Sequence, residues 1–98
     1  MSELDTTTLH AVAESAQSAA TRAGLGDKPG AEAALERATR HYVALCASYP
    51  SHARIVRLAR EAITRARTAV ENMGGKATRR EAGAFVRATA RAVERAKA

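Results

Sequence analysis

Histidines and carboxylates could hold a metal ion, and this chain has three histidines on three different segments: His10, His41 and His52. His10 and Glu14 are one helical turn apart and could face the same ion, but a protein zinc site needs three or four ligands. Metal sites in helical bundles usually contain Glu-x-x-His pairs on facing helices, and the sequence has no such pair. We therefore expect no metal ion and no other cofactor.

Cys46 is the one candidate nucleophile with a histidine close to it in sequence. His41 precedes it by five residues, which is about 140° around a helix, so the two side chains diverge. Cys46 adjoins Leu45 on an apolar stripe, where we expect it to be a small buried hydrophobe. The chain has no phosphate-binding loop, dinucleotide fingerprint or Gly-x-Ser-x-Gly motif. The sequence predicts no catalytic residues, no small-molecule substrate and no enzyme activity.

Arginines near the C-terminus form the most distinctive pattern. Four of them fall within about 80° of one another on a helical wheel, nearly opposite the apolar residues of the same segment. They are Arg80, Arg87, Arg91 and Arg95. Arginine forms bidentate hydrogen bonds to phosphate and carboxylate groups, so we expect these four to be the principal contacts with an acidic partner.

A second group of arginines lies in the preceding helical segment and points away from its apolar stripe. This group consists of Arg57, Arg60 and Arg67. Its charge is offset more fully, because Glu61 can pair with Arg57 or Arg65, and Glu71 with Arg67. We expect these three arginines to be secondary contacts.

The charge distribution indicates an acidic partner. The net charge is +6, and residues 51–98 hold 12 basic and 4 acidic side chains. We expect a small non-catalytic binding or regulatory protein whose partner is, by a narrow preference, nucleic acid, because the surplus charge runs along a whole helix. The alternatives are an adaptor or inhibitor that binds an acidic protein, and a self-assembling structural protein. The arginines could also be ordinary solvated surface, reflecting a GC-rich genome.

The composition predicts a single all-α domain over residues 1–98. Alanine and arginine are strong helix formers and number 25 and 13, against 3 aromatic residues. Glycine and proline divide the chain into four helices of similar length, about 3–23, 29–48, 52–73 and 79–97. Short connections favour an up-down-up-down four-helix bundle with Ala-rich seams. The alternative is two helical hairpins that complete their core by dimerising.

Apolar spacing of three and four residues predicts which side chains lie inside. The expected large core residues are Leu35, Tyr42, Leu45, Ile55, Ile63, Val70, Phe85, Val86 and Val93. Gly24 is the expected left-handed residue after the first helix, with Leu25 packing behind it. Ser51 and Thr78 are the expected caps of the last two helices.

A cytoplasmic location is the expectation for this chain. The single cysteine excludes an internal disulfide and fits a reducing compartment. The start of the sequence is acidic and lacks the basic segment and apolar run of a signal peptide. No apolar run reaches the length of a membrane span. We therefore expect no membrane partner, and a homodimer remains open.

Overall fold

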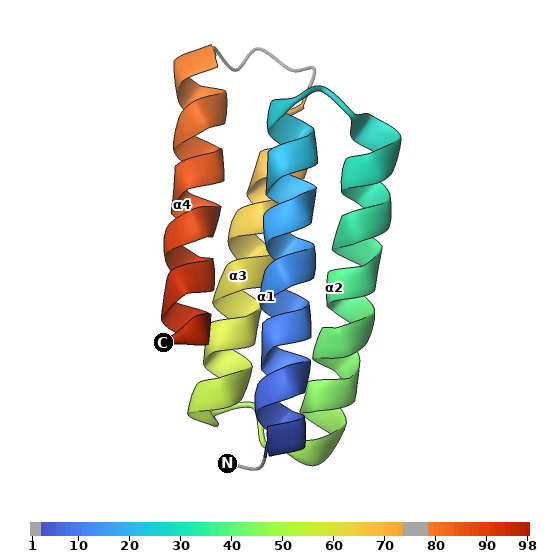
Figure 1. Cartoon of the computed structure of the whole chain (residues 1–98), viewed down its shortest axis with the longest axis vertical. Coiled ribbons are helices and arrows are strands. Elements are labelled where there is room, and N and C mark those ends of the chain that lie inside the picture. The colour runs from blue at the N-terminus through green and yellow to red at the C-terminus, as the bar shows by residue number, and fades with distance from the viewer. Residues whose placement is uncertain (1–2, 74–78) are drawn as a thin grey trace.

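The computed structural model describes residues 3–73 and 79–98, with side chains for 6–73 and 80–98. These residues form four helices: α1 (Glu3–Gly24), α2 (Lys28–Ser48), α3 (Arg54–Glu71) and α4 (Arg79–Lys97). No strand occurs among the described residues, which confirms the all-helical fold class. The helices pack into a globule of 41 × 22 × 19 Å whose long axis follows the helices (Figure 1).

Helices α1 and α3 form the centre of the molecule. α1 packs against all three other helices, and α3 does the same. Between the described parts of α2 and α4 there is no contact, and Figure 1 shows them on opposite sides of the central pair. The two outer helices therefore each bury one side and leave a broad face exposed.

Alanine makes up much of the core. Fully enclosed alanines occur on all four helices. On α3 they are Ala59, Ala62 and Ala66, which have no exposed surface. Valine and isoleucine fill the remaining space, chiefly Val12, Val56 and Ile63. Small side chains let helix axes approach closely, so the stability of this core depends on close packing more than on large buried groups.

The large residues expected inside are buried to different degrees. Those that are buried as predicted are Leu45, Ile55, Ile63, Val70 and Val93. Leu35 and Tyr42 are only partly buried and pack against the edge of the core. The prediction was wrong for Phe85 and Val86, which are half-buried. Both lie in the first half of α4, whereas the enclosed residues of α4 belong to its second half, from Thr89 onward.

The end of α1 is a Schellman motif centred on Gly26. Gly26 has φ of 81°, its amide donates to the carbonyl of Ala23, and the Asp27 amide donates to that of Arg22. The prediction of Gly24 as the left-handed residue was therefore wrong by two positions. Gly24 continues the helix, and Leu25 is 79% exposed rather than packed behind the turn.

Asp27 joins the end of α1 to the start of α2. Its carboxylate accepts a hydrogen bond from the Gly30 amide at 3.1 Å and one from the Arg22 guanidinium at 3.0 Å. The Gly30 amide, and then Arg22, hold the pKa of Asp27 below its usual range. The aspartate thus caps α2 and at the same time fixes the turn between the two helices.

We expect Asp27→Asn to be less stable than wild type near neutral pH and equally stable in acid. Asparagine keeps the capping oxygen, so the substitution removes only the charge. A carboxylate whose pKa is lowered by folding stabilises the protein above its unfolded pKa of about 4, and this contribution is lost as the pH falls through the folded value. Urea unfolding midpoints measured from neutral to acidic pH test this.

The control for that comparison is Asp27→Ala, which removes the cap as well as the charge. It should be less stable than Asp27→Asn at every pH. A constant difference between wild type and Asp27→Asn across the whole pH range would contradict the role of the charge.

Ser51 does not cap α3. α3 begins after Ala53, which makes no side-chain capping bond, so the prediction of Ser51 as the cap was wrong. The reason is that residues 51–53 form a turn held by the Ala53 amide bonding to the Pro50 carbonyl, which delays the helix. Thr78, the expected cap of α4, lies outside the described residues.

Candidate functional site

The histidines and the cysteine do not form a site in the described part of the chain. No group of three or more His, Cys, Asp or Glu side chains there could hold a metal ion. Cys46 is exposed, so the prediction that it is buried was wrong. α2 buries only a narrow sector that includes Ala38 and Leu45, and Cys46 lies about 100° beyond Leu45, outside that sector.

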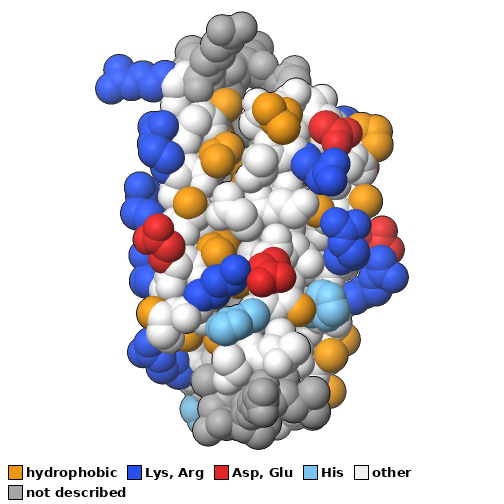
Figure 2. All heavy atoms as spheres, viewed as in Figure 1, with side chains coloured by type: hydrophobic (Ala, Val, Ile, Leu, Met, Phe, Trp, Pro, Cys, Tyr) orange, Lys and Arg blue, Asp and Glu red, His pale blue; other side chains and the backbone are white. Residues whose placement is uncertain are grey.

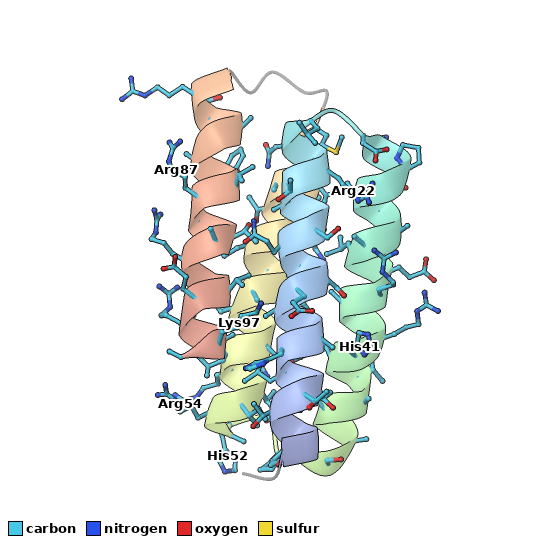
Figure 3. The ribbon with its side chains drawn as sticks, in the orientation of Figure 1. Arg22, His41, His52, Arg54, Arg87 and Lys97 are labelled. Carbon is cyan, nitrogen blue, oxygen red and sulfur yellow. The ribbon has the colours of Figure 1, made fainter. Side chains whose placement is uncertain are left out.

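The four α4 arginines chosen from the sequence are all exposed, on the side of the helix opposite its core residues. Thr89, Ala92, Val93 and Ala96 are buried, and the Thr89 hydroxyl donates to the Phe85 carbonyl within the helix. Figure 2 shows Lys and Arg side chains gathered along the left edge of the molecule, over α4. In Figure 3 Arg87 points away from the bundle on that side.

Two ion pairs show how α4 is rotated about its own axis. Arg95 binds Glu61 of α3, and Lys97 lies 3.4 Å from Glu14 of α1. The side of α4 that carries Arg95 therefore faces α3, and the side that carries Lys97 faces α1. The prediction that Glu61 pairs with Arg57 or Arg65 was wrong, because the partner of Glu61 comes from another helix. No ion pair joins Glu71 to Arg67 in the described residues, although both side chains are placed.

The contacts of Glu61 and Arg60 show the rotation of α3 in the same way. Glu61 faces α4, whereas the Arg60 guanidinium donates to the Tyr42 hydroxyl of α2 at 3.0 Å and to the Ser51 carbonyl at 3.3 Å. Arg60 is thus used to hold α2 and α3 together. Arg67 lies about 20° from Arg60 on the wheel and shares the α2 side.

A different set of α3 arginines lies beside α4. Arg54, Arg57 and Arg65 are exposed and fall within about 40° of Glu61 on the wheel. In Figure 3 Arg54 projects below the C-terminal end of α4, toward the side on which Arg87 projects. Of the three secondary arginines predicted from the sequence, the structure places only Arg57 next to the α4 row.

Arg54 and Arg65 are not in the set chosen from the sequence. The pattern of α3 places all its arginines outside the core, but it does not say which side of the helix faces α4. The Glu61 to Arg95 contact and the Arg60 to Tyr42 contact distinguish the two sides, and the sequence offers no sign of either pairing.

We call the combined surface the α3–α4 face. It consists of Arg54, Arg57, Arg65, Arg80, Arg87, Arg91 and Arg95, together with Glu61, Glu81 and Glu94. Among the described residues, Arg87 and Arg91 take part in no ion pair, and the exposed α2 surface differs in this respect. There Lys28 pairs with Glu32 and Arg40 with Glu36, which leaves Arg37 as the one of the three Lys and Arg side chains of α2 without an ion pair in the described residues. The α3–α4 face thus keeps a positive surplus that its own carboxylates do not neutralise.

A depression of about 630 Å³ adjoins the N-terminal half of α4. It is lined by Gly24, Leu25, Ala82, Gly83, Val86 and Arg87. A β-carbon on Gly24 would lie 3.2 Å from Val86, so the small residue there allows α4 to pack against α1. Arg87 is the one ionisable group in this lining, and it belongs to the α3–α4 face already described.

No protein-family model matches this sequence, and comparisons with curated proteins and with solved structures also found no match. None of the helices in the described ranges has the length and apolar content needed to cross a membrane. Function is therefore inferred from the arrangement of the chain's own side chains.

Proposed function

We propose that this chain is a small non-catalytic binding or regulatory protein that engages nucleic acid through the α3–α4 face. Arg80, Arg87, Arg91 and Arg95 are the principal contacts, and the arginines of α3 that lie beside them are secondary. The observation that carries the proposal is the exposed arginine row of α4, in which Arg87 and Arg91 take part in no ion pair among the described residues, extended by a second row on α3. Phosphate groups are the acidic partner that such a row fits best.

The extent of the charge supports nucleic acid over an acidic protein. Arg80 and Arg95 are 15 residues apart, which is about 22 Å along a helix. An acidic protein surface usually presents a compact group of carboxylates, whereas a nucleic acid presents phosphates at regular intervals over such a length. We keep an acidic protein partner as the alternative outcome of the experiments.

The proposal includes an up-down-up-down topology and a bundle that acts without a second copy. The α1–α2 and α2–α3 connections lie at opposite ends of the long axis, which supports the topology (Figure 1). The enclosed alanines on all four helices support a core that is complete within one chain. We also propose a cytoplasmic location, supported by the lone cysteine.

Binding measured at several salt concentrations tests the proposal. The wild-type chain should bind a fluorescent duplex, and log K should fall linearly with log salt with a slope of roughly −0.9 per phosphate contact. Arg87→Ala should flatten that slope by about one unit, while Arg37→Ala, an exposed arginine on α2, should leave it unchanged. The absence of salt-dependent binding to any nucleic acid would overturn the proposal.

A further inference from the structure

The two rows of the α3–α4 face point to a more specific partner, and this inference rests on the proposed function. We propose that the partner is double-stranded DNA, held across its minor groove with the α4 row on one phosphate strand and the α3 row on the other. Three features of the face favour this partner: the separation of the rows, their length, and the side chains that lie between and around them.

The separation of the rows fits a minor groove. Packed helix axes are about 8–10 Å apart, and α3 and α4 pack against each other, with Arg95 binding Glu61 across their junction. The minor groove of B-DNA is about 6 Å wide between the surfaces of its two phosphate edges, so the phosphate centres lie several ångströms farther apart, within reach of arginine side chains that project from two packed helices. Double-stranded RNA has a wide, shallow minor groove, which two rows this close together do not span as well.

The length of the face fits about one turn of duplex. Arg54 precedes Glu61 by seven residues, and Arg80 precedes Arg95 by fifteen. α4 descends as α3 rises in Figure 1, so Arg54 and Arg80 mark opposite ends of the face. The distance between them is about 33 Å along the bundle. One turn of B-DNA is about 34 Å long, and the minor groove winds once around the duplex in that length, so the straight α3–α4 face meets both phosphate strands of the groove over only part of the turn.

The residues between the two arginine rows are small enough for a DNA duplex to approach the α3–α4 face closely. Ala84 and Ala88 fall within about 20° of Arg95 on the wheel, so α4 presents small side chains toward the α3 row. Asn72 lies at this edge and could read a base, but its amide donates to the Thr68 carbonyl. We therefore expect recognition of the backbone without strong sequence preference.

The positions of the aromatic residues argue against a single-stranded partner. Binding of single strands usually relies on exposed aromatic rings that stack on the bases. Tyr42 and Tyr49 are partly buried against the core, and the Tyr42 hydroxyl accepts a hydrogen bond from Arg60. Phe85 is half-buried and lies about 80° from Arg95 on the wheel, away from the outward arginines.

The test compares the wild-type chain with two double variants. One replaces two arginines of α3, and the other replaces two arginines of α2. The Arg54→Ala, Arg65→Ala variant removes two contacts from the proposed α3 row, and the Arg37→Ala, Arg40→Ala variant removes the same charge from α2. The probes are an AT-rich DNA duplex, one of its single strands, and an RNA duplex of equal length. A dye that binds the DNA minor groove serves as competitor, and circular dichroism confirms that each variant is folded.

We expect the wild type to prefer the DNA duplex over the other two probes by about tenfold, and the dye to displace it. The α3 variant should flatten the salt slope on duplex DNA by about two units, and the α2 variant should leave it unchanged. Three results would each overturn the inference while leaving the proposed function intact: equal or tighter binding to single strands or RNA, duplex binding that the dye does not affect, and equal slopes for the two variants. Binding to none of the three probes would overturn the proposed function itself.

Discussion

Replacing Arg87 and Arg91 together by glutamate should weaken binding to duplex DNA by at least about 100-fold at a fixed moderate salt concentration. Each replacement removes one phosphate contact and adds a charge that the phosphates repel. Neither arginine takes part in an ion pair among the described residues, so its guanidinium is available to the partner. Fluorescence anisotropy at one salt concentration measures the change in Kd.

The matched control is Arg37→Glu with Arg40→Glu on α2, which changes the net charge by the same amount. It should weaken binding only a few-fold, through the long-range field alone. If both double variants weaken binding equally, the contact is not specific to the α3–α4 face. If the wild type captures one acidic protein and binds no nucleic acid, and the Arg87, Arg91 variant loses that capture, the adaptor alternative replaces the proposal.

A variant that changes neither nucleic-acid binding nor protein capture would mean that the α4 arginines are ordinary solvated surface. The self-assembling alternative would then become the better explanation. Sedimentation of the wild-type chain over a range of concentrations would test it, because a structural oligomer gains mass as concentration rises.

The sequence alone could predict the α4 row but not its neighbours on α3. The row follows from one helix, because spacing along α4 determines which arginines are opposite Val93 and Ala96. The α3 row depends on how α3 is rotated relative to α4, and that rotation is set by packing between helices far apart in sequence. Arg60 and Arg54 look alike in the sequence, yet one binds Tyr42 of α2 and the other lies beyond the end of α4.

The same distinction explains which parts of the fold could be predicted. The all-helical class follows from composition and from glycine and proline positions, which act locally. The burial of Phe85 and Cys46 could not be read from local pattern, because it depends on how far a neighbouring helix extends beside them. α2 and α4 each lie on one side of the central pair, so each buries a narrower sector than its apolar stripe predicts.

The alanine core leads to the second large expected effect, which concerns Ala66. Ala66 is fully enclosed. On the helical wheel it lies about 140° from Glu61, which faces α4, and about 120° from Arg60, which faces α2. Its side chain therefore points into the centre of the bundle. α1 packs against this side of α3. A leucine at this position has no space, and the central helices would have to move apart or adopt strained rotamers.

We expect Ala66→Leu to lower the free energy of unfolding by about 3 kcal/mol, a large part of the 5–15 kcal/mol typical of a small domain. Ala44→Leu makes the same change on the exposed side of α2 and should alter stability by no more than about 0.5 kcal/mol. Urea denaturation followed by circular dichroism gives both values, since the transition midpoint falls with stability while its slope is retained. Equal stability of the two variants would show that α1 and α3 are not closely packed at Ala66. The rotation of α3, and with it the pairing of the two arginine rows, would then need to be reassigned.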